Sequence, residues 1–355
     1  MQEHSLDNRN WQQTVAGIYN LPTPLPPYEP NRSAEEYLNT CATWTPPPAP
    51  DEEAHAWYRA ATTLQSTVMK SAQEYQQMLQ LYEAAARRGH YTAIKQLTII
   101  YSTPWIAMKA DFPAEPEKAR YWLNYGLKQG WTGALEWLAN ALIDGDAEFP
   151  HDPQLGMAYL QLASDRGVAL AQWQLSLEFR NPNDVAKEEA LLECAARQDL
   201  HAALRTFASY TAINKKPREA LELYHRAVMA GGESGGEAAY TLSQSFGSNR
   251  GRYQRLGTFE DPIRKKAYAE IDRVIRDGEG RMMGNMFMRF PRLNDVLPLP
   301  PAKVTEWKGI YSAMSEDDAA YYQNPPPPEF YLKQVEAAGL LVPLEYLTQP
   351  VMRAD

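Results

Sequence analysis

Histidine and cysteine are scarce in this chain of 355 residues, which holds six histidines and two cysteines. The histidines are His4, His55, His90, His151, His201 and His225. None of them forms a His-x-x-x-His pattern, and the cysteines form no Cys-x-x-Cys pair, so the spacings that place two ligands together are missing. Gly278-Glu-Gly280 also lacks the full glycine pattern of a dinucleotide-binding loop. The sequence therefore predicts no metal site and no cofactor.

The two cysteines leave two interpretations open. Cys41 lies in a proline-rich segment, and Cys194 occupies an apolar position of a predicted helix. The first interpretation is a buried free thiol at Cys194 and an unpaired Cys41, because free cysteine behaves as a small apolar residue. The second is a disulfide between them, which an oxidising compartment would permit. We expect the first.

Long apolar runs and an excess of basic charge are also absent. No stretch of about 18 apolar residues occurs, so no transmembrane helix is expected. The formal net charge is -9, which argues against nucleic acid as a partner and allows a basic protein partner. The start, Met1-Gln-Glu-His-Ser, resembles no signal peptide. The chain is therefore either cytoplasmic or an exported protein whose signal lies outside it.

Patterns typical of enzymes are weak. Gly232-Glu-Ser234-Gly-Gly236 matches a nucleophile elbow, but a helix is predicted before it and no histidine follows it. The stretch 144–148 is acidic, yet Phe149 and Leu155 occupy the positions where a calcium loop needs glycine and glutamate. We expect two flexible turns here, and no enzyme.

The first 50 residues are rich in proline, as in Leu21-Pro-Thr-Pro-Leu-Pro-Pro and Thr45-Pro-Pro-Pro. Such density excludes helix interiors and central strands. We expect an irregular, polyproline-like arm with one short helix at 33–41. Its aromatic residues indicate that it packs against the rest of the chain. These residues are Trp11, Tyr19, Tyr28, Tyr37 and Trp44.

An internal repeat follows the arm. The stretch Tyr82 to Gly89 reads Tyr-Glu-Ala-Ala-Ala-Arg-Arg-Gly, and related stretches end at Gly130, Gly167, Asp199 and Gly231. The spacings between these five residues are 41, 37, 32 and 32 positions. A period in this range with helix-turn-helix content is typical of helical solenoids. We therefore expect each of the five residues to mark a chain reversal between two helices.

Residue size around the reversals supports this interpretation. Small residues lie four positions before and four after, as Ala85 and Ala93 do around Gly89, and let two helices approach closely. Glycine ends the first helix in the left-handed conformation at low cost, whereas Asp199 does so under some strain. In the fifth unit, Gly231-Gly-Glu-Ser-Gly-Gly is expected to lengthen the turn, with the second helix resuming near Glu237.

Helix start signals predict where the helices of the repeats begin. Asp51 is a predicted N-cap, Ser71 with Glu74 forms a capping-box pattern, and Asp152 precedes a proline at the first helical position. Pro116, Pro217 and Pro262 are predicted helix starts of the same kind. The insertion 102–116 is expected to be a binding loop. Near the end of the chain, short helices are expected at 316–323, 329–338 and 343–347.

The predicted fold is all-α: a right-handed α-α solenoid of about five helix pairs. The predicted domains are a proline-rich arm at 1–50, helical repeats at 51–250, and a C-terminal capping region at 251–355 that folds against the last repeat. The stretches Tyr82 to Ala93 and Tyr159 to Ala171 resemble Sel1-like repeats, which are relatives of the tetratricopeptide repeat. The resemblance covers about residues 74–246 and implies a groove that binds protein.

A second resemblance concerns the C-terminal region. Val296-Leu-Pro-Leu-Pro-Pro-Ala-Lys followed by Trp307-Lys-Gly resembles the tail of bacterial Sel1-like proteins that accompany secreted toxins. Some of these are immunity proteins of type VI secretion lipase effectors, held in the periplasm as lipoproteins. This resemblance implies a protein that binds and blocks a cognate toxin, and that touches a membrane only through a lipid anchor absent from this chain. The alternative is a general scaffold that assembles bacterial envelope or signalling complexes.

Aromatic and arginine residues are the candidates for the partner-binding surface, because Trp, Tyr and Arg dominate interface energetics. We expect Trp122, Tyr159 and Trp173 in the core, and partial exposure for three other tryptophans. The candidate partner-binding residues are Trp105, Trp131, Trp137, Arg250, Arg252, Tyr253 and Arg255.

Overall fold

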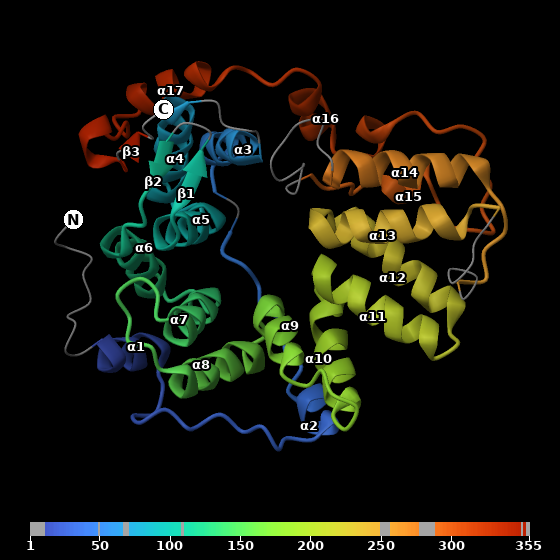
Figure 1. Ribbon diagram of the computed structural model, residues 1–355, viewed down its shortest axis with the longest axis horizontal. Helices are drawn as coiled ribbons and strands as arrows, with labels where there is room; N and C mark the ends of the chain where they lie inside the picture. The colour runs from blue at the N-terminus through green and yellow to red at the C-terminus, as the bar shows by residue number, and fades with distance from the viewer. Residues whose placement is uncertain are drawn as a thin grey trace. The chain divides into compact units, whose positions relative to one another are not determined.

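The computed structural model of the protein describes residues 11–48, 50–66, 71–107, 110–248, 256–276, 288–348 and 351–352 (Figure 1). Contacts within the chain define two compact units. Unit 1 comprises Met1–Ser33, Thr40–Leu175 and Pro327–Asp355, and unit 2 comprises Ala34–Asn39 and Ser176–Pro326. Each unit therefore combines segments that are distant in the sequence.

Five successive helix pairs lie between Ala72 and Ser245, as the repeat predicted. The pairs are α4 (Ala72–Arg87) with α5 (Tyr91–Ser102), α6 (Pro116–Lys128) with α7 (Gly133–Asp144), α8 (Pro153–Asp165) with α9 (Ala169–Leu177), α10 (Val185–Arg197) with α11 (His201–Ile213), and α12 (Pro217–Ala230) with α13 (Gly232–Ser245). Helix α3 (Glu52–Ser66) precedes the pairs and α14 (Pro262–Arg276) follows them. The predicted helical solenoid is confirmed.

The five predicted reversals all have a positive φ angle. The φ angles are 80° at Gly89, 71° at Gly130, 89° at Gly167, 57° at Asp199 and 72° at Gly231. At the first reversal His90 N donates to Ala85 O at 3.0 Å, which satisfies a carbonyl at the helix end. One to four residues thus separate the end of each first helix from the start of the second.

Asp199 takes this conformation without the freedom of glycine, and a neighbouring helix holds it there. Arg226 of α12 donates to Asp199 Oδ1 at 2.7 Å and to Ala196 O at 2.8 Å. The arginine thereby ties the strained reversal to the last turn of α10.

The glycine-rich stretch of the fifth unit is helical, so the expected longer turn is wrong. Helix α13 begins at Gly232, directly after the reversal, and contains Ser234 in its first turn. A Cβ atom on Gly235 would lie 2.8 Å from Ala227 O, and one on Gly236 would lie 2.8 Å from Arg276 Cγ. The glycines serve close packing of α13 on α12 and α14, and this benefit exceeds their low helix propensity.

The predicted helix starts are confirmed. Asp51 Oδ1 accepts from Ala54 N at 2.8 Å, and Asp152 Oδ1 accepts from Leu155 N at 3.0 Å. Ser71 and Glu74 form the reciprocal capping box at the start of α4. Helices α6, α12 and α14 begin at their prolines. These local signals fixed the phase of the repeats correctly because capping involves only neighbouring residues.

The insertion between α5 and α6 is a small hairpin in unit 1. Strand β1 (Trp105–Ala107) pairs antiparallel with β2 (Ala110–Phe112), which also pairs with β3 (Val351–Met352) near the C-terminus. Phe112 is fully buried, and its ring stacks on Tyr75 of α4 at a centroid distance of 3.8 Å. The insertion is therefore anchored to the first repeat by an aromatic contact.

The N-terminal arm packs against the repeats, as its aromatic residues predicted. It contains α1 (Trp11–Tyr19), which the sequence did not predict, and α2 (Ala34–Asn39), which it did. Trp11 is buried against Phe149 and Tyr159, with ring centroids 5.3 and 6.3 Å away. The sequence did not reveal this helix because it is only nine residues long, and three buried side chains are too few to establish a helical spacing.

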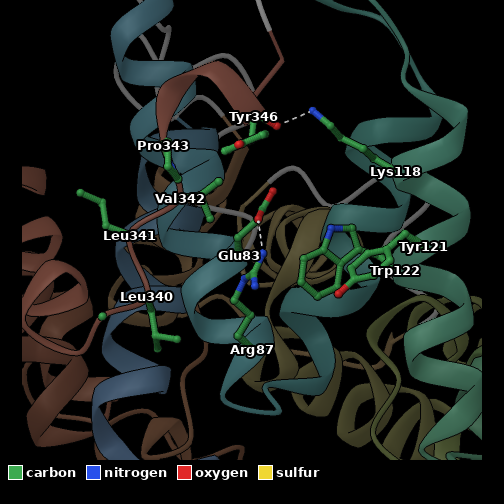
Figure 2. Close-up of a pocket in the computed structure, with 11 residues that line it drawn as sticks. Glu83, Arg87, Lys118, Tyr121, Trp122, Leu340, Leu341, Val342, Pro343 and Tyr346 are labelled. Atoms are coloured by element: carbon green, nitrogen blue, oxygen red, sulfur yellow. Dashed lines mark hydrogen bonds and ion pairs between the residues drawn. The ribbon is translucent and has the colours of Figure 1, made fainter. Parts of the chain in front are cut away.

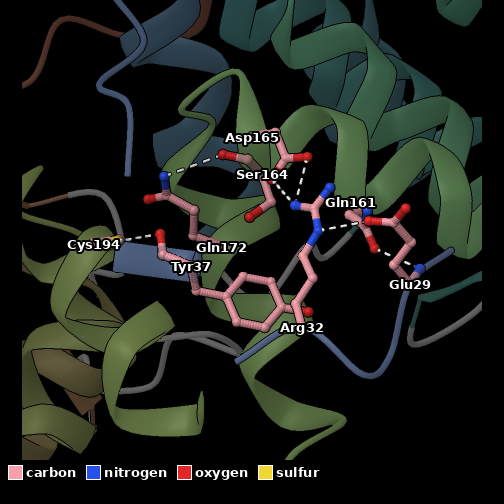
Figure 3. A network of polar contacts seen from close by, with 8 residues as sticks. All are labelled: Glu29, Arg32, Tyr37, Gln161, Ser164, Asp165, Gln172 and Cys194. Carbon is pink, nitrogen blue, oxygen red and sulfur yellow. Dashed lines mark hydrogen bonds and ion pairs between the residues drawn. The ribbon is translucent and has the colours of Figure 1, made fainter. Parts of the chain in front are cut away.

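Polar contacts fasten the middle of the arm to α8 (Figure 3). Arg32 donates to both carboxylate oxygens of Asp165 at 2.7 and 2.8 Å, and Glu29 N donates to Gln161 Oε1 at 2.9 Å. Trp44 N donates to Gly167 O at 3.1 Å. The arm thus lies directly over the third reversal.

The two cysteines are disulfide-bonded, so the expected free thiols are wrong. Helix α2 packs on α10, where Tyr37 is 2% exposed against Phe179. Sequence patterns could not reveal the pairing, because it depends on the route of the irregular arm.

The C-terminal region is shared between the units. Helices α14, α15 (Leu293–Val296) and α16 (Glu316–Gln323) and the 3-10 turn η3 (Ile310–Ala313) belong to unit 2, where α14 packs on α13 as expected. Helix α17 (Pro328–Ala337) and the 3-10 turn η4 (Leu344–Tyr346) instead belong to unit 1, where α17 packs on α3 and α4. The expectation that the whole region folds against the last repeat is therefore wrong.

Exposed helix faces explain this division. The first helices of unit 1 have no preceding repeat to cover them, and α17 supplies that cover. Gln77 Nε2 donates to Glu329 Oε1 at 2.9 Å, and Gln80 Nε2 donates to Val342 O at 2.9 Å. In unit 2, His225 of α12 contacts Tyr268 Oη at 2.7 Å and Asn294 Oδ1 at 2.8 Å. A neutral His225 satisfies both, donating to Asn294 and accepting from Tyr268.

Two glycines at reversals give a matched test of the arm contact. A Cβ atom on Gly89 meets nothing within 4 Å, whereas one on Gly167 would lie 2.6 Å from Trp44 N. Because φ is positive at both, Gly89→Ala should cost about 1 to 2 kcal/mol of unfolding free energy. Gly167→Ala should cost about 3 kcal/mol or more, since the arm must also move. Urea denaturation measures both, and equal losses would contradict the packing of the arm on this reversal.

Acidification should destabilise the protein through buried histidines. Burial, aided by the nearby Arg264 charge and opposed by the hydrogen bond to Asn294, lowers the pKa of His225 to about 4. Burial likewise lowers the pKa of His90 and of His201 to about 4. Between pH 6.5 and 4 the unfolded chain binds more protons at these residues, so stability falls as pH falls through this window.

Each such histidine contributes up to about 1.4 kcal/mol per pH unit within the window. His225→Gln should therefore reduce the pH dependence of the unfolding free energy between pH 6.5 and 4.5 by about a third, although stability at pH 7.5 falls. An unchanged slope in urea denaturation would show that His225 titrates normally.

Candidate partner-binding surfaces

The second helices of the pairs present one face of each unit, and one register position on this face pairs charges between neighbouring repeats. Six positions after the reversals lie Lys95 and Glu136 in unit 1, and Arg205 and Glu237 in unit 2. Lys95 Nζ donates to Glu136 Oε2 at 3.1 Å, and Arg205 Nε lies 2.8 Å from Glu237 Oε2. The repeat therefore sets the register of ion pairs as well as of the core.

The two ion pairs differ in burial. The Glu136 side chain is 2% exposed and also accepts from Asn140 Nδ2 at 2.6 Å. The side chains of Arg205 and Glu237 are 37% and 41% exposed. The pair in unit 1 consequently supports the fold, whereas the pair in unit 2 is accessible to a partner.

Trp131 and Trp137, two predicted binding residues, meet in one aromatic cluster of unit 1. The ring of Tyr91 lies 5.3 Å from Trp131, 4.9 Å from Trp137 and 5.3 Å from Trp44 of the arm, measured between centroids. Trp131 is half-buried, in line with the expected partial exposure. The cluster places Trp131 where a partner can reach it.

Trp137 is only 4% exposed, so its expected partial exposure is wrong. Its ring covers Gly126, where a Cβ atom would lie 2.5 Å from Trp137 Cζ3. The sequence held a signal for this contact, since glycine replaces alanine at this repeat position only in the second unit. Trp122 and Tyr159 are 2% exposed, which confirms them as core residues, whereas Trp173 is half-buried.

The other predicted binding residues are not placed by the structure. Trp105 belongs to β1, but its side chain lies outside the description. Arg250, Arg252, Tyr253 and Arg255 lie outside the described residues. Their role in binding stays a prediction.

A hollow of about 340 Å³ lies on the second-helix face of unit 1. We call it the α5–α7 hollow, and its lining includes Lys95, Thr98, Ile99, Ser102, Thr103, Trp137, Asn140, Ala141, Asp144, Asp146, Ala147 and Gln174. The lining mixes apolar surface with carboxylates. It thereby offers both contact area and charge.

A groove of about 510 Å³ lies on the second-helix face of unit 2. We call it the α11–α13 groove. Ile213 and Tyr240 line it and are 57% and 40% exposed, and the Arg276 guanidinium lies 5.5 Å from the Tyr240 ring centroid. Exposed tyrosine and arginine are typical of interface hot spots. The sequence analysis missed Tyr240, although the other second helices carry Thr, Ala, Ser and Ala nine positions after the reversal.

A third cavity, of about 370 Å³, lies between α4, α6 and the C-terminal segment (Figure 2). Glu83 of α4 is 5% exposed and accepts from Tyr101 Oη at 2.8 Å and from Arg87 at 3.3 Å. Burial raises the pKa of Glu83, although these two hydrogen bonds oppose the shift. Lys118 Nζ donates to Tyr346 O at 2.7 Å and so holds the C-terminal segment over the cavity.

The chemistry of this cavity is limited. Its lining residues include one carboxylate and no histidine, cysteine or serine. The titratable side chains that line it are Glu83, Arg87, Lys118, Tyr121 and Tyr346. Elsewhere in the described chain no group of three or more His, Cys, Asp or Glu residues could hold a metal ion. The described helices also include none long and apolar enough to cross a bilayer.

The fold and these faces define a helical-repeat protein, and solved structures share its architecture. Protein PA5086 of Pseudomonas aeruginosa is 24% identical, with a TM-score of 0.53 over 79% of this chain and 98% of the other. Immunity protein Pa5087 of Pseudomonas aeruginosa is 22% identical, with a TM-score of 0.53 over 78% and 96%. Immunity protein PA5088 of the same organism is 22% identical, with a TM-score of 0.51 over 76% and 93%.

At the sequence level, residues 238–341 match a domain of unknown function, DUF6396. This range includes most of α13, all of α14 and the C-terminal region up to the end of α17. No curated protein matches the chain. The resemblance to immunity proteins that the sequence indicated is thus matched by the solved structures of similar fold.

The two ion pairs at the same register position predict different energetic costs. Glu136→Ala leaves the Lys95 ammonium and the Asn140 amide without their acceptor, and should cost about 3 kcal/mol of unfolding free energy. Glu237→Ala removes a partly exposed pair and should cost less than about 1 kcal/mol. Urea denaturation of the two variants compares them directly, and a larger loss for Glu237→Ala would refute the assigned roles.

Proposed function

We propose that the protein is an immunity protein that binds and neutralises a secreted antibacterial effector. The observation that carries this proposal is the fold shared with immunity proteins Pa5087 and PA5088 through more than nine-tenths of their chains. Exposed Tyr240 and Ile213 on the second helices of unit 2 support it, as does half-buried Trp131 at the reversal before α7, because such side chains have the chemistry of a protein interface.

The effector is a type VI lipase-like enzyme under this proposal, on the basis of the C-terminal motif. The motif has a structural role in unit 2: Arg264 of α14 donates to Pro298 O at 2.6 Å and to Ala302 O at 2.7 Å. Trp307 Nε1 donates to Glu270 Oε2 at 2.8 Å. The motif thus packs against α14, the helix that follows the last repeat. This role is compatible with an architecture shared by proteins that carry the same tail.

The compartment we propose is the periplasm. Disulfides persist in oxidising compartments such as the periplasm and are rare in the cytosol. The bond between Cys41 and Cys194 fastens the arm beside α10 and closes a loop of about 150 residues, a length at which cross-linking restricts the unfolded chain strongly.

Mixing with any lipase that is encoded next to the gene tests the proposal. The full chain should form a complex with a dissociation constant below about 1 µM, and phospholipid hydrolysis should stop at equimolar ratio. Calorimetry and release of fatty acid from vesicles are the two measurements. A complex that leaves hydrolysis unchanged would favour a scaffold, and no complex at micromolar concentration would reject the proposal.

Survival of cells tests the compartment. Cells that receive the lipase in the periplasm should survive when this protein is exported with a cleavable signal, and should die when the same protein stays in the cytoplasm. Protection from the cytoplasm would contradict a periplasmic function.

A further inference from the structure

The α5–α7 hollow carries negative charge that the described chain does not neutralise. Its one cation, Lys95, is already paired with Glu136. Asp144 and Asp146 have no cationic partner among the described residues. Burial and the like charge of Asp144 raise the pKa of Asp146, as expected for two carboxylates that repel each other.

Two helix ends add to this negative potential. Helix α5 ends at Ser102 and is followed by Thr103, and α7 ends at Asp144; all three residues line the hollow. The carbonyl end of a helix carries a partial negative charge that favours cations within the last turn. Asp144 therefore sits where its own helix disfavours a carboxylate, and a cation would relieve this.

A further acceptor and an apolar wall complete the hollow. Gln174 also lines it; this residue is half-buried, and its buried Oε1 atom has no donor among the described residues. Ile99 of α5 is 46% exposed on the same face, beside the buried Trp137. Acceptors without donors next to apolar surface match a side chain with an aliphatic stem and a charged, donor-rich head.

We propose that the α5–α7 hollow receives an arginine or lysine side chain of the effector, with the stem on Ile99 and the head between Asp144 and Asp146. This inference rests on the proposed function and adds the surface and the partner chemistry to it. A cation seated there replaces carboxylate repulsion by two charge-assisted hydrogen bonds. The hollow then acts as an electrostatic anchor that also speeds encounter.

A small probe tests the hollow without the effector. Full-length protein labelled with 15N is titrated with N-acetyl-arginine amide and N-acetyl-lysine amide, and with the uncharged N-acetyl-citrulline amide as control. Saturable shifts at the amides of Thr98 to Thr103 and Asp144 to Ala147 are expected with the cationic probes, with dissociation constants of about 1 to 30 mM. Absent shifts, or equal shifts with citrulline or with calcium chloride, would overturn the proposal.

Matched variants connect the probe to the effector. Asp144→Asn with Asp146→Asn should abolish the probe shifts and weaken effector binding at least tenfold, without lowering the melting temperature. Glu52→Gln with Glu117→Gln changes the net charge equally at exposed residues of α3 and α6, and should alter neither. If the variant with both aspartates replaced still neutralises the lipase normally, the proposed binding site in the hollow is rejected, whereas the proposed immunity function is retained. If the lipase is never bound while the probe shifts occur, the proposed function fails instead.

Discussion

The structure depends on one constraint, the close approach of two helices across a reversal with a positive φ angle. Five reversals meet it, four with glycine and one with Asp199. Small residues on either side keep the helix backbones close, and the larger apolar residues fill the space that remains. Where two helices approach even more closely, glycine occurs inside a helix. Gly235 of α13 is an example, because it packs against Ala227 O of α12. The register of every second helix follows from where its reversal lies.

This register also distributes polar chemistry. Positions six residues after the reversals face the neighbouring repeat, so opposite charges there meet as Lys95 with Glu136 and Arg205 with Glu237. Burial then decides what each pair does. The first pair is enclosed and contributes to folding, whereas the second borders an open groove beside Tyr240. A repeat protein can thus vary its surface while its core geometry is kept.

Segments outside the repeats cover the faces that the repeats leave open. The arm crosses the third reversal and is held by Arg32 on Asp165 and by the disulfide at Cys41. Helix α17 covers the first helices of unit 1, while the motif around Pro298 packs against α14 in unit 2. Because these covers occupy other faces, the second-helix faces with the α5–α7 hollow and the α11–α13 groove stay accessible within their units.

The sequence by itself determined the helix pairs, the five reversals, the helix caps and the class of fold, because each depends on residues within a few positions of one another. It also indicated the packed arm through its aromatic residues. Only the tertiary structure decided the disulfide, the burial of Trp137 on Gly126, the helical glycines of α13 and the place of α17. Each of these depends on which distant segments meet, and a local pattern carries no information about the path of the chain between them.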